Sequence, residues 1–281
     1  MEQTSELRAG VIGLGQIGGG VAVSLLNSGR IPTVYDIVPD AYKKLKGMPE
    51  QVTTLAELAA QSDVIMVAVI NYQQCLDVIT GEGGLLENAH EGMMITTLST
   101  ISVDECRELA RLCAEKGVGY MDIGVTLGAR AYTNGLVAMC GGSKAAFDYA
   151  SPVLADWSSS HILCGPVGAG MACKIARNLN TYGLWAVVNE SYNMVTSAGV
   201  DGEKFLEVIA AADKLESLTY MWNIARSNDE DNEMPPLPEH VYTLMVKDLK
   251  AAKALADSLG LDVPYTDELM KSGRSIFGEL L

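Results

Sequence analysis

Short apolar runs alternate with helical patterns along the first 165 residues. Seven runs rich in aliphatic residues have the length and composition of β-strands. They are Ala9–Ile12, Ile31–Tyr35, Val64–Val69, Met93–Leu98, Tyr120–Val125, Leu136–Cys140 and Ile162–Cys164. Between them, the spacing of apolar residues predicts helices over Gln16–Asn27 and Val103–Lys116. This alternation is typical of βαβ units around a largely parallel sheet.

The pattern changes after residue 165. Gly168–Ser197 has a helical pattern almost throughout, and the segments that follow are mostly helical too. An acidic stretch, Asp229–Glu233, and three prolines at positions 235, 236 and 238 interrupt these helices. We therefore predict an α/β fold with two domains, residues 1–165 and 166–281, the second of them all-helical.

A glycine-rich turn follows the first predicted strand. Gly13–Gly18 reads G-x-G-x-x-G, a helix pattern follows it, and the next strand is followed by Asp36. In a Rossmann domain the first glycine allows the tight turn, the second lets a pyrophosphate approach the backbone, and the third lets the helix pack closely on the strand. The helix N-terminus then binds the phosphates. This context predicts an NAD(P)-binding Rossmann domain.

Asp36 also bears on the choice between NAD and NADP. Its carboxylate can accept hydrogen bonds from the adenosine ribose hydroxyls, whereas a 2′-phosphate would be repelled by it. Ile37 follows at a position where NADP-binding proteins often carry arginine. The sequence favours NAD, and Lys43 and Lys44 nearby leave NADP open as the alternative.

Composition and charge restrict the function classes. The chain has 281 residues, 48% of them hydrophobic, and a net charge of −15, which argues against a nucleic-acid or anionic-membrane surface but not against a small anionic ligand. We find no apolar run of the roughly 20 residues that span a bilayer. The polar start, Met1–Arg8, does not resemble a secretory signal, so we expect a cytoplasmic protein.

The cysteines and histidines give no metal-binding pattern. Six cysteines are scattered without a C-x-x-C motif, which predicts buried thiols, and the three histidines are not spaced as zinc ligands. We therefore predict no metal site. The three tryptophans, Trp157, Trp185 and Trp222, are expected to be packing residues.

A second group of candidate residues lies at the start of the long helix. In "GPVGAGMACKIARN", Lys174 and Asn178 are four residues apart and share a helix face. A lysine beside a nicotinamide cofactor can donate a proton to a carbonyl oxygen, or take one from a hydroxyl, if its pKa is lowered toward neutrality. Asn178 could hold the substrate or the amine.

Five segments together resemble the β-hydroxyacid dehydrogenase family, which includes the 3-hydroxyisobutyrate dehydrogenases. "GAGMACKIARN" resembles the family's G-x-x-x-K-x-x-x-N catalytic motif, and "MDIGVTLGARAYTNGLVAMCGGS" stands where the family has D-A-P-V-S-G-G. The other three segments are "VIGLGQIGGGVAVSLLNSG", "TLSTISVDECRELA" (with Thr97 where the family's D-x-S-T has Asp) and "VKDLKAA". The resemblance covers nearly the whole chain.

The resemblance implies a Rossmann domain joined by a long interdomain helix to an all-helical substrate and dimerisation domain. It also implies reversible NAD(P)-linked oxidation of a small 3-hydroxy acid in a homodimer or homotetramer. By position, Lys174 is the general acid/base and Asn178 supports it. The cofactor-binding residues are Gly13, Leu14, Gly15, Gln16, Ile17, Gly18, Asp36, Val69, Thr100 and Lys247. The substrate-binding residues are Thr126, Leu127, Gly128, Arg130, Lys174 and Asn178.

The substrate segment departs from the family pattern. Thr126 and Leu127 replace the usual Ser-Gly pair, which should narrow or redirect the pocket and makes 3-hydroxyisobutyrate itself a poorer candidate. Arg130 follows, and its guanidinium could bind a carboxylate, phosphate or sulfonate, or form a surface salt bridge.

Two other functions stay open on the sequence alone. Imine reductases share this architecture, but they carry another residue, often Asp or Tyr, in place of the lysine. A dinucleotide-binding protein without catalysis is the third hypothesis, and it predicts no role for Lys174.

Overall fold

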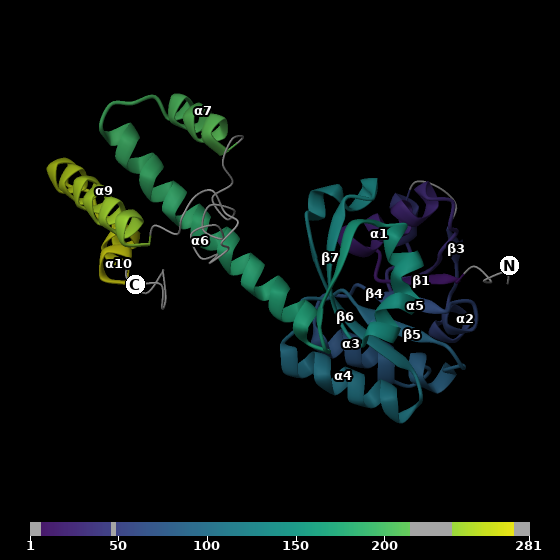
Figure 1. The fold of residues 1–281 in the computed structure, drawn as a ribbon. Helices are drawn as coiled ribbons and strands as arrows, with labels where there is room; N and C mark the ends of the chain where they lie inside the picture. Colours follow the sequence, from purple (N-terminus) through teal and green to yellow (C-terminus); the bar gives the residue numbers. More distant parts are fainter. Residues whose placement is uncertain (1–6, 46–48, 214–237, 273–281) are drawn as a thin grey trace, which may run out of the picture. The chain divides into compact units, whose positions relative to one another are not determined.

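The computed structural model of the chain describes residues 7–45, 49–213 and 238–272 (Figure 1). Residues up to Asn178 form one compact unit and those from Leu179 onward form another. Helix α6 (Ala169–Ser197) crosses this division, so its first turns belong with the sheet, whereas the sequence predicts a boundary at residue 165. The acidic stretch 229–233, Pro235, Pro236 and Trp222 lie outside the described residues.

One eight-stranded sheet forms the framework of the first unit. The strand order is β3-β2-β1-β4-β5-β6-β7-β8, and all neighbours are parallel except β6 and β7. The strands are β1 (Ala9–Ile12), β2 (Thr33–Tyr35), β3 (Glu50–Gln51), β4 (Val64–Val67), β5 (Met94–Thr97), β6 (Gly119–Thr126), β7 (Leu136–Gly141) and β8 (Ser158–Gly165). All seven predicted strands are present. The sequence missed β3, two exposed polar residues with no apolar pattern.

Helices cover both faces of this sheet. They are α1 (Gln16–Asn27), α2 (Leu55–Ala60), α3 (Tyr72–Thr80), α4 (Val103–Glu115) and α5 (Lys144–Ala155), with 3₁₀ turns η1 (Ala41–Lys44), η2 (Leu85–Asn88) and η3 (Gly128–Thr133). The prediction for α1 is correct at both ends, and α4 begins as predicted at its N-cap, Ser102, whose hydroxyl accepts from the Glu105 N–H. Such caps satisfy N–H groups that have no partner within the helix.

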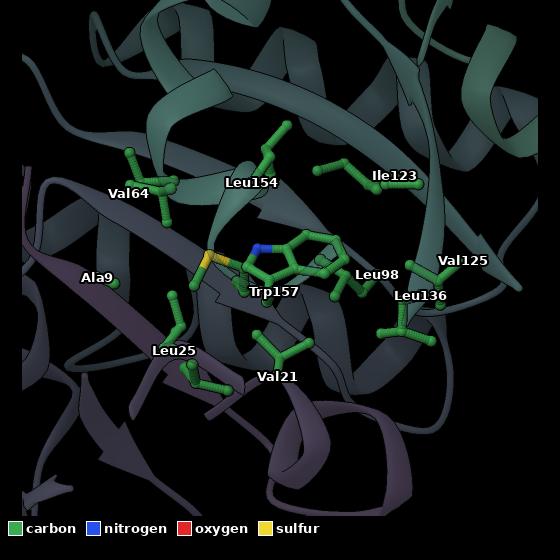
Figure 2. Close-up of a cluster of buried hydrophobic side chains, with 14 of the residues drawn as sticks. Ala9, Val21, Leu25, Val64, Leu98, Ile123, Val125, Leu136, Leu154 and Trp157 are labelled. Carbon is green, nitrogen blue, oxygen red and sulfur yellow. The ribbon is translucent and has the colours of Figure 1, made fainter. Parts of the chain in front are cut away.

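The apolar side chains of each strand alternate between two cores. In β4, Val64 and Met66 face the core that α1 and α5 cover, and Ile65 and Val67 face the core that α2, α3 and α4 cover. Trp157 is fully buried in the first core (Figure 2), as predicted for a packing residue. Because side chains alternate along a strand, each strand contributes to both layers.

The second unit is helical in its described part. Beyond the rest of α6 it contains α7 (Gly202–Asp213), α9 (Pro238–Leu259) and α10 (Pro264–Ser272). Met194, Ala256 and Val263 form a small buried cluster. Glu190 of α6 accepts hydrogen bonds from the first N–H groups of α10, those of Tyr265 and Thr266, each at 2.9 Å.

Two side-chain expectations are only partly met. Cys75, Cys106, Cys113 and Cys140 are buried, but Cys164 is half-buried and Cys173 is exposed. Trp185 is 63% exposed on α6, so it does not pack into a core of the single chain. In the described ranges, no three His, Cys, Asp or Glu side chains gather as a metal site, and no helix there is long and apolar enough to span a membrane.

Candidate active site

The three motif glycines occupy three different environments. Gly13 has φ +84°, and a Cβ atom on it would lie 2.4 Å from the carbonyl oxygen of Ala68. A Cβ atom on Gly18 would lie 1.9 Å from the carbonyl oxygen of Gly13. A Cβ atom on Gly15 would meet nothing within 4 Å. The structure thus requires glycine for the turn and for close packing at two positions, and leaves open space beside the third.

The N-terminus of α1 lies beside this open space. Its N-cap is Gly15, so no side chain caps the first turn, where Gln16 and Ile17 lie. The Leu14 side chain is buried, and its N–H donates to Oδ2 of Asp36 at 2.6 Å, while the Val38 N–H donates to Oδ1 at 2.7 Å. These two bonds hold the Asp36 carboxylate next to the glycine turn.

Val69 and Thr100 lie at the carboxyl edge of the neighbouring strands. A side-chain carbon of Val69 is 3.3 Å from where a Cβ atom on Gly13 would be, and the Ser99 hydroxyl donates to the Val69 carbonyl at 2.7 Å. Thr100 lines a cavity of about 580 Å³. The other lining residues are Asn71, Tyr72, Gln73, Ile101, Ser102, Glu105 and Ile175. The cavity lies at the starts of α3 and α4, beside α6 residue Ile175.

The first turns of α6 rest on β6 and β7. A Cβ atom on Gly170 would lie 2.3 Å from the Met139 carbonyl oxygen and 2.7 Å from that of Asp122, so only glycine allows this approach. One turn later, the Cβ atom of Lys174 is 2.4 Å from where a Cβ atom on Gly124 would be. The lysine side chain therefore starts directly over the backbone of β6.

Asn178 lies one turn beyond Lys174 on α6. Both Lys174 and Asn178 are half-buried. A position of Asn178 beside the substrate segment stays a prediction.

The Lys174 amine has the electrostatic environment of a proton-transfer group. Burial lowers its pKa below the usual lysine range, and the positive charge of Arg177 lowers the pKa further. Among the described carboxylates, none forms a salt bridge with Lys174. Because an acidic partner would favour the charged form, this arrangement eases loss of the proton.

A buried carboxylate holds the N-terminus of α6. The Gly168 N–H donates to Oδ1 of Asp122 at 2.6 Å, and the Met171 N–H donates to Oδ2 at 2.7 Å. Asp122 is fully buried on β6. Burial raises the pKa of Asp122, and the backbone N–H donors oppose that rise.

The substrate segment packs against the cofactor-binding helix. Leu127 has φ +63° and is 41% exposed, and the η3 turn follows it. A Cβ atom on Gly20 of α1 would lie 2.3 Å from the Ala131 Cβ, and the Ser24 hydroxyl donates to the Ala131 carbonyl at 2.7 Å. The Gln16 amide is 3.4 Å from the Gly128 carbonyl oxygen. The structure thus brings this segment next to the glycine turn.

Arg130 lies in the first unit and Lys247 in the second. The stem of Arg130 covers Gly135, the residue is exposed, and none of the described acidic side chains pairs with its guanidinium. Lys247 lies on α9, in the second unit, where its Nζ is 3.3 Å from Asp248. Its place beside the cofactor stays a prediction.

Sequence reasoning missed the residues that support Lys174. Asp122 is the acidic residue of the segment that stands in for D-A-P-V-S-G-G, and it interrupts an apolar strand, so a signal was present. Gly124, two residues on, carried no signal of its own. Asn71 and Ser102 line the cavity together with Thr100. In the sequence they have the pattern of ordinary helix N-caps, so nothing marked them as site residues.

Comparisons with known proteins agree with this arrangement. Residues 8–168 match the family model of the NAD binding domain of 6-phosphogluconate dehydrogenase. Residues 168–276 match the model described as the NAD-binding domain of NADP-dependent 3-hydroxyisobutyrate dehydrogenase. The chain is 29% identical over 267 residues to the mitochondrial 3-hydroxyisobutyrate dehydrogenase of Homo sapiens, covering 90% of this chain and 77% of that one.

Solved structures show the same fold. One is described as an oxidoreductase from Mycobacterium avium 104. It has a TM-score of 0.88 at 27% identity, over 97% of this chain and 99% of that one. An imine reductase from Aspergillus terreus has a TM-score of 0.75 at 20% identity, over 97% and 94% of the two chains. At 20% identity, the similarity to the imine reductase concerns the fold alone.

Proposed function

Because this chain belongs to the β-hydroxyacid dehydrogenase family, we propose that it is an NAD(P)-dependent dehydrogenase that interconverts a small 3-hydroxy acid and its semialdehyde acid. Its membership already makes it an NAD(P)-binding oxidoreductase. The observation that carries the finer proposal is Lys174, which is half-buried over Gly124 at the carboxyl edge of the sheet and has a lowered pKa.

The glycine turn fits a dinucleotide. The space beside Gly15, the uncapped first turn of α1 and the fixed Asp36 carboxylate match a pyrophosphate and a ribose. When bound, the nicotinamide cofactor supplies or accepts the hydride. Val69 and Thr100, at the ends of the next strands, would bound its nicotinamide half, and Lys247 is our further candidate contact.

Lys174 moves the proton in this proposal. In reduction its ammonium donates a proton to the carbonyl oxygen of the substrate, and in oxidation its neutral amine takes the hydroxyl proton. A pKa closer to working pH makes both directions accessible, since proton transfer is efficient when the two forms are both populated. Asn178, one turn further, holds the substrate or the amine.

The substrate segment binds the acid group. The Thr126 hydroxyl and the Gly128 backbone lie at the carboxyl end of β6, and the exposed Arg130 guanidinium supplies a cation for a carboxylate or a related anion. The Leu127 side chain stands where the family has glycine. We therefore expect a substrate other than 3-hydroxyisobutyrate itself.

We further propose that NAD is preferred to NADP. In this proposal the Asp36 carboxylate, held beside the glycine turn, accepts hydrogen bonds from the ribose hydroxyls. The nearby Lys43 forms an ion pair with Asp40 at 2.7 Å. A 2′-phosphate would therefore meet a carboxylate, while one candidate cation is already partnered. Steady-state kinetics with both cofactors test this, and a higher kcat/KM with NADP would contradict it.

A cytoplasmic location is part of the same proposal. All six cysteines are free thiols in the structure, which fits a reducing compartment. Fractionation of cells that express the tagged chain tests the location, and recovery in a secreted or organellar fraction would contradict it.

The deciding experiment compares two lysine variants on a panel of small hydroxy acids, including phosphorylated and sulfonated ones. We expect Lys174→Ala to bind NADH normally, measured by fluorescence titration, and to lose turnover by at least about 100-fold. Lys144→Ala is the matched control, because Lys144 is an exposed lysine paired with Asp148 on α5. Turnover of Lys174→Ala equal to that of the wild type would refute the proposed role.

Imine reduction is the second candidate function. The bulky Leu127 at the substrate segment favours it, because an apolar side chain there suits a less acidic substrate. Assays of cyclic imines beside hydroxy acids separate the two. A protein that turns over neither class, and in which Lys174→Ala leaves every measurable property unchanged, would be a non-catalytic dinucleotide-binding protein.

A further inference from the structure

Helix α6 carries Lys174 only five residues after its first residue, so the position of the helix start decides where the amine lies. The first N–H groups of any helix have no partner within the helix itself. In α6, the N–H of Met171 and that of Gly168, just before the helix, both donate to the Asp122 carboxylate, at 2.7 and 2.6 Å. The two bonds use both carboxylate oxygens.

The surroundings of Asp122 leave it little freedom. It is fully buried, and a Cβ atom on Gly141 of the neighbouring strand would lie 2.3 Å from its Oδ1. Gly170 fits against the Met139 and Asp122 carbonyl oxygens in the same way. The carboxylate and the helix start therefore have one well-defined arrangement.

Strand β6 links the Asp122 carboxylate to the position of Lys174. Gly124 is two residues beyond Asp122 on β6, and the Lys174 Cβ packs over it. The side chain of Asp122 thus holds the start of α6, and the backbone of the same strand, two residues further on, lies beneath Lys174. Any shift of the first turn of α6 moves the lysine along or away from β6.

We propose that Asp122 is a positioning residue for the reaction: by holding the Gly168 and Met171 N–H groups, it sets the height and rotation of α6, and with them the place of the Lys174 amine. This inference rests on the proposed function, in which Lys174 transfers the proton. A misplacement of about 1 Å can cost roughly 100-fold in rate, so such a residue is kinetically important without touching the substrate.

The test variant is Asp122→Asn. The amide has nearly the same shape, but it offers one acceptor oxygen, so one of the two backbone N–H groups then faces an NH₂ group. We expect kcat to fall at least about tenfold while KM for NADH stays within about twofold, because the cofactor turn is untouched. We also expect the pH inflection of Lys174 to rise, since a loosened helix start admits water.

Glu190→Gln is the matched control. Glu190 is also a buried carboxylate, and it also accepts two helix-start N–H groups, those of Tyr265 and Thr266. We expect it to lower thermal stability in the way that Asp122→Asn does, and to leave kcat and the pH inflection unchanged. Equal losses of kcat in both variants would overturn the inference, because the effect would then be general destabilisation.

Two further measurements keep the outcome decisive. If Asp122→Asn does not fold, Asp122→Ser replaces it, because its hydroxyl accepts one N–H without burying a charge, and the same fall in kcat is expected. Folded Asp122 variants with wild-type kcat and pH inflection would overturn the positioning role, even if Lys174→Ala is inactive. Full activity of Lys174→Ala would instead overturn the proposed function itself.

Discussion

At the scale of single residues, the proposed proton transfer depends on the surroundings of the Lys174 amine. Lys174 is half-buried over a glycine, beside Arg177 and without a described acidic partner. Both influences disfavour the charged form, so the pKa is lowered. Sequence reasoning could identify this lysine by its motif, but a motif contains no information about burial.

The pH dependence of turnover tests this environment. We expect kcat for oxidation to rise with pH as Lys174 loses its proton, with an inflection below the usual lysine range, and kcat for reduction to fall over the same interval. Arg177→Gln removes the neighbouring positive charge, so the inflection should move to higher pH. Initial rates across pH in both directions measure it, and an inflection that moves down in Arg177→Gln would contradict the assignment.

Among the described residues, two besides glycine adopt a left-handed backbone, and we expect their replacement by glycine to affect stability to different extents. Leu127 has φ +63° with an exposed side chain, and Asn134 has φ +55° with an amide that donates to the carbonyl oxygens of Ser24 and Asp156. In Leu127→Gly, relief of backbone strain and the greater freedom of the unfolded chain nearly cancel, so we expect a change of less than about 1 kcal/mol.

Asn134→Gly has the same backbone but loses the amide. We expect it to lower the free energy of unfolding by about 2 kcal/mol, because the two hydrogen bonds that the amide donates to the Ser24 and Asp156 carbonyl oxygens are lost. Urea denaturation of both variants measures the difference. Equal effects would mean that backbone strain, and not hydrogen bonding, sets the stability of this segment.

At the scale of elements, the glycines in and before α1 have two structural causes. Gly13 and Gly18 are required by the turn, as the motif predicts. Gly20 is required by the contact with η3, because a Cβ atom there would lie 2.3 Å from the Ala131 Cβ. The sequence could not show the second cause, since α1 and η3 are about a hundred residues apart and no local periodicity links them.

Alanine substitutions at two helical glycines should therefore have opposite effects. Alanine in place of glycine stabilises a helix by up to about 1 kcal/mol where space permits. Gly183 of α6 has nothing within 4 Å of its added Cβ, so Gly183→Ala should raise the unfolding temperature. Gly20→Ala should lower it, because overpacking costs roughly 1–3 kcal/mol and exceeds the gain. Thermal unfolding by circular dichroism checks both signs.

At the scale of the whole molecule, α6 exposes an apolar side. Leu179, Tyr182 and Trp185 are 73%, 58% and 63% exposed, lie on one side of the helix, and include a Tyr182–Trp185 ring contact at 5.5 Å. Exposed apolar groups of this kind mark association surfaces. We propose that a second copy of the chain covers them in a homodimer or homotetramer.

Charge substitutions on this side test the assembly. We expect the wild type to elute as a dimer or tetramer in size-exclusion chromatography with light scattering, and the Leu179→Glu, Trp185→Glu double variant to shift toward the monomer, because burying two carboxylates costs several kcal/mol. Ile31→Glu is the control, since Ile31 is 65% exposed outside α6. A monomeric wild type would exclude the proposed assembly.

The sequence by itself determined the elements whose signal is local: the seven longer strands, α1, α4, the long helix, the glycine turn and the candidates Asp36 and Lys174. Tertiary structure decided which of these meet. Asp122 and Gly168 are 46 residues apart, yet their hydrogen bond fixes the start of α6, and Gly124 is what places Lys174 on β6. Periodicity reports which face of an element is apolar, whereas such contacts depend on how close two backbones come, and only the packed structure contains that distance.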